Sequence, residues 1–78
     1  MKFKIRILLL NDSIGVAIDQ IYLNNIIALT NYYFWPKTDA WKLIQIEIGS
    51  KNWLNENEKI LILNRLTEIL NSWKKSQK

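Results

Sequence analysis

The first part of the chain alternates between apolar and polar positions with the two-residue period of a β-strand. Between residues 2 and 7, apolar side chains alternate with basic ones, which predicts a strand over residues 2–10 with one buried and one basic face. Leu8 and Leu10 continue the basic face with apolar side chains, so we expect the end of this strand to be buried on both sides. Turn-forming residues follow at positions 11–13 and predict a hairpin.

A second alternation covers residues 14–23 and predicts the partner strand of that hairpin. A helix that begins at a Ser13 cap is the alternative, because apolar residues of this segment would then also share one face. The strand is favoured at this point, since the segment is rich in β-branched residues and Gly15 would weaken a helix. Asn24 and Asn25 predict a turn after it.

The second half of the chain changes from a strand pattern to a helix pattern. Residues 26–36 are rich in β-branched and aromatic side chains and predict an extended segment. Pro36 ends this segment, because proline cannot donate to a β-ladder. Apolar residues then recur with helical spacing over residues 39–49 and 56–74, which predicts two helices.

Capping residues mark the ends of these helices. Thr38 or Asp39 would cap the start of the first helix, and Gly49 is a natural residue to end it. Asn55 followed by Glu58 is close to a capping box at the start of the second helix. The order of strands and capped helices gives each segment a defined beginning and end.

Each predicted helix has one apolar stripe that would face a shared core. The stripe residues are Ala40, Trp41, Ile44 and Ile48 in the first helix, and Ile62, Leu63, Leu66, Ile69, Leu70 and Trp73 in the second. One face of the sheet would pack against both stripes. We therefore predict a single domain over residues 1–78 with an α+β fold, in which an antiparallel β-hairpin or three-stranded sheet packs against two C-terminal helices.

Composition argues against several classes of function. The chain has 78 residues with no cysteine and no histidine, which removes disulfides, thiolate metal clusters and imidazole chemistry. Three of its seven acidic residues lie at turns or caps, and Glu56 and Glu58 point to different sides of a helix. The sequence has no catalytic pair and no phosphate-binding glycine loop. We expect no enzyme activity, cofactor, metal, small-molecule substrate or membrane span. A domain this small is only marginally stable alone, so we expect a partner to stabilise it.

The charge balance favours an anionic partner, since the net charge is +4 and the pI is about 9.5. Alternate residues on one face of a strand lie about 7 Å apart, close to the phosphate spacing along one nucleic-acid strand. Solubility and protection of a strand edge explain lysines equally well. The candidate phosphate-binding residues are Lys2, Lys4 and Arg6 in the first strand, Lys74, Lys75 and Lys78 near the C-terminus, and Lys37 between them.

The aromatic residues either stack on exposed nucleobases or pack inside the protein. Trp41 and Trp73 lie on the helix stripes, which favours the core. In an extended segment, alternate aromatics point to opposite faces, so one pair enters the core and the other is exposed. Trp53 is expected to cover the helix pair from the connecting loop. The aromatic candidates are Tyr32, Tyr33, Phe34, Trp35, Trp41, Trp53 and Trp73.

Residues 29–41 read Leu-Thr-Asn-Tyr-Tyr-Phe-Trp-Pro-Lys-Thr-Asp-Ala-Trp. This stretch resembles the signature of plastid-specific small-subunit ribosomal protein 3, a family of plastids and cyanobacteria whose pattern is roughly Leu-Thr-x-Tyr-Phe-Phe-Trp-Pro-Arg-x-Asp-Ala-Trp. Tyr33 and Lys37 depart from the pattern but keep its chemistry. Segments 11–20 and 63–73 also look like blocks of this family, so the resemblance covers most of the chain.

The resemblance implies a structural constituent of the plastid (chloroplast) small ribosomal subunit, located in the stroma. Its partners would be ribosomal RNA of that subunit and neighbouring small-subunit proteins, and its basic residues would contact RNA phosphates. Ile46, Ile60 and Leu61 lie off the helix stripes, as residues that contact a protein neighbour often do. A free-standing protein–protein interaction module acting as a homodimer and an RNA-binding protein acting off the ribosome are the alternatives.

Overall fold

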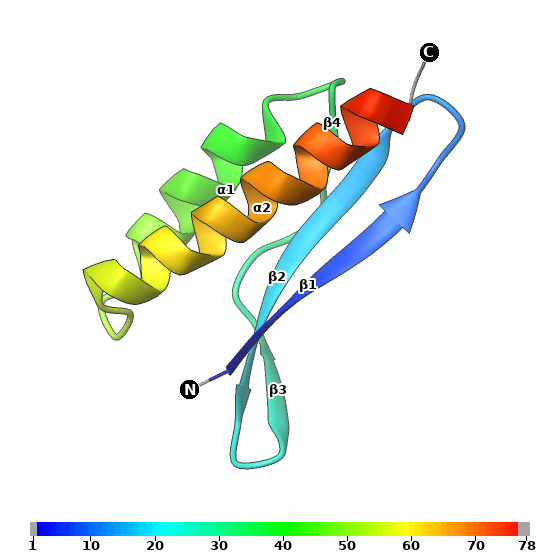
Figure 1. Ribbon diagram of the computed structural model, residues 1–78. Helices are drawn as coiled ribbons and strands as arrows, with labels where there is room; N and C mark the ends of the chain where they lie inside the picture. Colours follow the sequence, from blue (N-terminus) through cyan, green and yellow to red (C-terminus); the bar gives the residue numbers. More distant parts are fainter. Residues whose placement is uncertain (1, 77–78) are drawn as a thin grey trace.

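The computed structural model describes residues 2–76 of the chain. In this part, four strands precede two helices: β1 (Lys2–Leu9), β2 (Ile14–Tyr22), β3 (Asn25–Ala28), β4 (Tyr33–Trp35), α1 (Ala40–Gly49) and α2 (Glu56–Ser76). The strands form one antiparallel sheet, and both helices lie on one face of it (Figure 1). The predicted α+β fold, with two C-terminal helices on an antiparallel sheet, is confirmed. Neither helix is both long and apolar enough to cross a membrane.

β2 is the central strand of the sheet. β1 pairs along one edge of it, from Lys2 opposite Ile21 to Leu9 opposite Ile14. β3 and β4 share the other edge, where β3 pairs with residues 19–22 and β4 pairs with residues 14–16. The strand prediction for the β2 segment is therefore confirmed over the helix alternative.

The aromatic segment forms two short strands rather than one continuous strand. Between them the chain leaves the regular ladder, and the side chain of Thr30 replaces a backbone partner. The Thr30 Oγ1 atom accepts a hydrogen bond from the Ile18 N–H at 3.0 Å and donates to the Asn31 carbonyl at 2.9 Å. Leu29 N–H donates to the Ile18 carbonyl at 2.9 Å. These bonds keep the segment against β2 while the strand is interrupted. The Trp35–Pro36 peptide bond is cis.

One face of β2 and the helix stripes form the core. The register places alternate residues of β2 toward the helices, and these side chains are buried together with the helix residues predicted at the stripe centres. Four residues at the stripe edges are partly buried against this cluster: Trp41, Leu63, Ile69 and Trp73. The buried cluster comprises Ile14, Val16, Ile18, Leu29, Ala40, Ile44, Ile48, Leu54, Ile62, Leu66 and Leu70.

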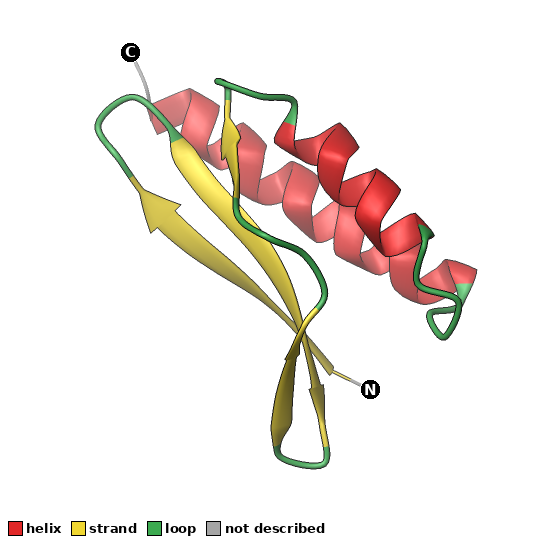
Figure 2. Ribbon diagram, turned by 180° about the vertical axis from the view of Figure 1, so that it is seen from behind, coloured by secondary structure: helices red, strands yellow, loops and turns green. Residues whose placement is uncertain are grey.

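Within residues 2–76, no helix covers the opposite face of the sheet, as the view from behind shows (Figure 2). Part of this face is covered by Phe34, which lies over Gly15 on β2. A Cβ atom at Gly15 would come within 2.7 Å of Phe34 Cε1, so the close approach of the ring requires glycine there. The ring of Tyr32 stacks beside Phe34 with 6.3 Å between the ring centroids. These two aromatics seal the outer side of the central strand.

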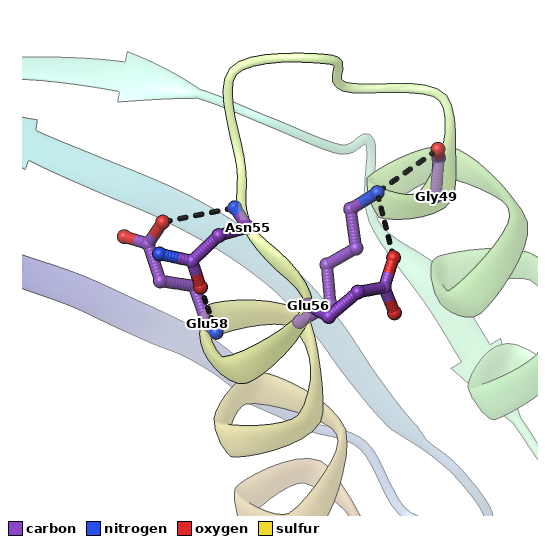
Figure 3. A network of polar contacts seen from close by, with 5 residues as sticks. Gly49, Asn55, Glu56 and Glu58 are labelled. Atoms are coloured by element: carbon purple, nitrogen blue, oxygen red, sulfur yellow. Dashed lines mark hydrogen bonds and ion pairs between the residues drawn. The ribbon is translucent and has the colours of Figure 1, made fainter.

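Side chains cap the starts of both helices. Asp39, one of the two predicted caps, accepts a hydrogen bond from the Lys42 N–H at 3.1 Å at the start of α1. At the start of α2, Glu58 N–H donates to Asn55 Oδ1 at 2.8 Å, and Asn55 N–H donates to Glu58 Oε1 at 3.0 Å (Figure 3). The capping box is therefore confirmed. Gly49 is the last residue of α1 rather than its cap, and Ser50 takes that position with φ of −80°.

The expectation that the end of β1 is buried on both sides is wrong. Ile7, Leu8, Leu9 and Leu10 are between 44% and 69% exposed. The helices cover one face of the sheet, and the aromatic cover on the other face lies over β2. A run of apolar residues therefore reaches the surface at the edge of the sheet.

Candidate RNA-binding surface

Apart from Arg6, the basic residues of the described part of the chain that are predicted to contact RNA form two groups, one near each end of β1. Lys2 and Lys4 are exposed near the start of β1. At the other end, Lys37 is close to Asp12 in the turn after β1, and Lys74 and Lys75 are in the last turn of α2, whose end lies near that turn (Figure 1). The length of β1 separates the two sites by about 25 Å. Lys78 falls outside the described residues.

The second of these sites brings together residues that are far apart in the sequence. Lys74 Nζ lies 5.0 Å from the centroid of the Trp35 ring, which joins the end of α2 to the end of β4. Lys37 follows Trp35 by two residues, and its Nζ lies 3.8 Å from Asp12 Oδ1 in the turn after β1. Lys37, Lys74 and Lys75 form one of the two basic sites, and Lys2 and Lys4 form the other.

Arg6 differs from Lys2 and Lys4, although the alternation puts all three on the same face. Its Nε lies 2.7 Å from Asp19 Oδ2, and the Asp19 side chain is 4% exposed. The guanidinium also lies over the Tyr32 ring, 5.0 Å from its centroid. Arg6 thus neutralises a buried carboxylate and holds an aromatic ring of the open face. Contact with a phosphate would compete with both interactions.

The remaining aromatic candidates have intramolecular contacts. Trp41 Nε1 donates to Thr67 Oγ1 at 2.9 Å and so connects α1 to α2. Trp53 Nε1 donates to Gln20 Oε1 at 3.0 Å, which places its ring beside β2 rather than over the helix pair. Trp53 is 56% exposed, the largest exposed fraction among the four tryptophans. Trp35 and Trp73 pack against the core cluster.

Tyr33 connects β4 to α1 from the helix-facing side of the sheet. Its hydroxyl donates a hydrogen bond to Glu47 Oε1 on α1. This hydrogen bond, burial and the negative charge of Glu47 together raise the pKa of Tyr33 above its ordinary value of 10.0. The protonated tyrosine is therefore the form that the folded protein favours.

Replacing Tyr33 with phenylalanine should lower the free energy of unfolding by about 1 kcal/mol at neutral pH, because the hydrogen bond to Glu47 is lost. The folded pKa lies above the unfolded one, so this contribution is complete below about pH 10 and is lost as the pH rises through the folded pKa. Urea unfolding near pH 7 and near pH 11 measures the difference from the unmodified protein. The exposed Tyr22, changed to phenylalanine, is the matched control. If the loss of stability in Tyr33→Phe is the same at both pH values, the hydrogen bond from the protonated Tyr33 to Glu47 does not account for it.

Sequence reasoning missed three polar residues that organise this region: Asp19, Thr30 and Glu47. Each interacts across elements, with Arg6, with the backbone of β2 and with Tyr33 respectively. Asp19 was detectable in principle, because it is an acidic residue within a segment of otherwise strand-forming residues. The partners of Thr30 and Glu47 are 12 and 14 residues away in sequence, and only the folded topology brings them together.

Almost every position of the aromatic stretch therefore has a place in the fold. Leu29 and Ala40 are in the core, Thr30 and Asp39 bond to backbone groups, and the rings cover both faces of β2. This stretch joins the sheet to α1. Because packing and hydrogen bonds limit which residues fit at nearly every position of this stretch, similarity to other proteins there is informative.

The sequence profile of the family described as "Plastid and cyanobacterial ribosomal protein (PSRP-3 / Ycf65)" matches residues 29–76, more than half of the chain. A small ribosomal subunit protein cS23 from Gracilaria tenuistipitata var. liui is 48% identical over 77 residues, which cover 99% of this chain and 78% of the relative. The protein of the same name from Euglena viridis is 44% identical over 92% of this chain and 71% of its own length.

A probable small ribosomal subunit protein cS23 from a Synechococcus strain is 42% identical over 92% of this chain and 73% of the relative. The similarity thus extends over both the sheet and the helices, and it is found in an alga, a euglenoid and a cyanobacterium. The matched profile begins at Leu29, the first residue of the aromatic stretch. The chain belongs to the plastid and cyanobacterial ribosomal protein family PSRP-3/Ycf65.

Proposed function

We propose that this protein is a structural constituent of the plastid small ribosomal subunit, where it binds ribosomal RNA and neighbouring proteins and catalyses no reaction. The observation that carries the proposal is the similarity, over 99% of the chain, to a relative named as a small ribosomal subunit protein. The family description, which names plastids and cyanobacteria, supports the location.

The state of the lysines supports RNA phosphates as ligands. Within residues 2–76, Lys2, Lys4, Lys74 and Lys75 are exposed and form no ion pair with a carboxylate. Such lysines neutralise a phosphate without first breaking an internal pair. Neutralisation releases counterions from the RNA, and this release drives binding. The four lysines form the part of the surface best suited to an anionic partner.

The separation of the two basic sites indicates how the protein is held. Contacts at both ends of β1 would fix the orientation of the domain between two stretches of RNA backbone about 25 Å apart. Phosphate contacts position a protein without reading the base sequence. The buried or hydrogen-bonded aromatics keep the fold rigid between the two anchors. We infer a role in holding the local architecture of the subunit.

Rebinding to small subunits that lack the protein tests this role. Changing Lys74 and Lys75 together to glutamine should weaken binding, because each phosphate contact contributes to the salt dependence of affinity. The slope of log affinity against log salt should become shallower by about 0.7 to 0.9 for each lost contact. Changing Lys2 and Lys4 together should have a similar effect.

The control is Lys42→Gln, which removes an exposed lysine on α1 outside both sites. Its salt slope should equal that of the unmodified protein. All variants are first compared by circular dichroism, since these surface changes should leave the fold intact. If both double variants bind with unchanged slopes, the lysines do not contact phosphates and the proposed mode of binding is wrong.

A further inference from the structure

β1 forms an outer edge of the sheet. It pairs with β2 along its whole length, and no other strand within residues 2–76 pairs with it. The Leu10 N–H donates to the Ser13 carbonyl at 2.9 Å, so Leu10 and Ser13 form a hydrogen-bonded pair at the hairpin end. In an antiparallel ladder, hydrogen-bonded and non-hydrogen-bonded pairs then alternate along β1. By this alternation, the backbone N–H and C=O groups of Phe3, Ile5 and Ile7 point away from β2. The edge therefore offers a row of hydrogen-bonding groups to an additional strand.

An apolar groove lies beside this edge, between β1 and α2. It has a volume of about 440 Å³ and is lined by Phe3, Ile5, Ile7, Leu61, Ile62, Arg65 and Ile69. The residues of β1 that line it are the same ones whose backbone groups point outward. Leu61 is 66% exposed and Ile7 is 46% exposed at its walls. A second hollow of about 290 Å³ shares Ile7, Arg65 and Ile69, so the groove continues along the edge.

We propose that the edge of β1 binds an extended segment of a neighbouring protein, which joins the sheet as a further strand. Alternate side chains of this segment are apolar and fill the groove, and those between them are acidic. The acidic side chains lie on the opposite face of the sheet, where Lys2 and Lys4 lie between them and the RNA and neutralise both carboxylates and phosphates. The proposal rests on the proposed function for the source of the segment, a protein of the small ribosomal subunit.

The chemistry of the groove favours a polypeptide over RNA. Six of its seven lining residues are apolar, and the seventh, Arg65, is paired with Glu68 at 3.3 Å. Glu68 itself lines the continuation of the groove, where its negative charge would repel a phosphate. An added strand satisfies the backbone groups of the edge and covers the exposed apolar side chains at the same time.

Charge also argues against a second copy of this chain in the registers that pair residues 2–7 of the two copies with each other. In a symmetric antiparallel pair of β1 strands centred on Ile5, Lys4 would lie opposite Arg6 of the other copy. Centring the pair one residue earlier places Lys4 opposite Lys4 of the other copy, and centring it one residue later places Arg6 opposite Arg6. Like charges directly opposite each other destabilise a strand pair. An acidic segment removes this repulsion and replaces it with attraction.

A synthetic peptide, Glu-Val-Glu-Ile-Glu-Val-Glu with blocked ends and a fluorescent label, tests the proposal by anisotropy with the full chain. Leu61→Glu should weaken binding by about tenfold or more, because it places a charge in the groove. Leu61 is exposed, so this variant should fold normally. The matched control is Ile46→Glu, which changes an apolar residue of similar exposure on α1 and should leave binding unchanged.

Two further peptides separate the contributions. N-methylation of the valine and isoleucine residues removes their hydrogen bonds to the edge and should abolish binding. Replacing the glutamates with lysines should weaken binding by about tenfold or more. Binding of the acidic peptide that is unaffected by Leu61→Glu or by N-methylation would overturn the proposal. So would self-association of the chain through β1 without peptide binding, or binding of a single-stranded RNA oligonucleotide that Leu61→Glu weakens as much as it weakens binding of the peptide.

The inference and the proposed function fail differently. If the groove holds a protein of the subunit, Leu61→Glu weakens rebinding to small subunits without changing the salt slope. The Lys74 and Lys75 double variant, which lies outside the groove, changes that slope. If no peptide binds while the Lys74 and Lys75 double variant still changes the slope, the groove proposal is overturned and the proposed function stays in place.

Discussion

Changing Leu66 to alanine should destabilise the protein by about 3–5 kcal/mol, because the deleted atoms leave a cavity at the centre of the core. Leu66 has an exposed fraction of 0% on the sheet-facing stripe of α2. The total stability of a chain this short is of the same order, so a large fraction of the variant should be unfolded at 25 °C. Urea unfolding followed by circular dichroism and tryptophan fluorescence measures the loss.

The control for this prediction lies on the same helix. Leu61 is 66% exposed, so Leu61→Ala should change the free energy of unfolding by less than about 0.5 kcal/mol. The two variants remove the same atoms from the same kind of residue. A similar loss at both positions would mean that the helix does not pack on the sheet with the face described above.

Changing Arg6 to alanine should cost about 2–3 kcal/mol of stability, because the carboxylate of Asp19 loses its positive partner. Removing one member of a buried pair is strongly destabilising, and the exposure of the Arg6 side chain, 38%, lowers the cost somewhat. Lys4→Ala, on the same face of β1 but exposed, should have an effect below about 0.5 kcal/mol. Urea unfolding again provides the comparison.

Removing both charges distinguishes a loss of pairing from a loss of packing. The double variant Arg6→Ala with Asp19→Ala should be less destabilised than the sum of the two single variants, because no unpaired charge remains. Equal effects of Arg6→Ala and Lys4→Ala would contradict a structural role for Arg6. The arginine would then belong with Lys2 and Lys4 as a contact to phosphate.

The elements of the fold were predictable because each has a local pattern. Alternation identified β1 and β2, the apolar stripes identified the helices, and Asn55 with Glu58 marked the start of α2. These signals depend on neighbours within a few residues. They are therefore present in the sequence regardless of how the elements later pack.

What the pattern could not predict depends on packing between elements. Alternation showed that Leu8 lies on the same face as Arg6, but it could not show that no other element covers the end of β1. It also grouped Arg6 with two free lysines, although the pairing of β1 with β2 brings Arg6 to Asp19. The division of the aromatic segment into β3 and β4 depends on Thr30, whose partner is on β2.

The candidate site was predicted less completely than the fold. Lys2, Lys4, Lys74 and Lys75 are exposed, as an RNA contact requires, but their separation into two distant sites follows from the strand length and the course of α2. The groove between β1 and α2 has residues from both ends of the chain. The exposed position of Leu61, already off the helix stripe, was its one sequence signal.

The most direct test of the central claim is sedimentation of an extract from the organism's plastids or cells through a sucrose gradient, with an antibody against this chain. We predict that the protein migrates with the small subunit and with whole ribosomes at low salt and is released at high salt, because phosphate contacts weaken as salt rises. Finding the protein exclusively in the light fractions at low salt would contradict its place in the ribosome.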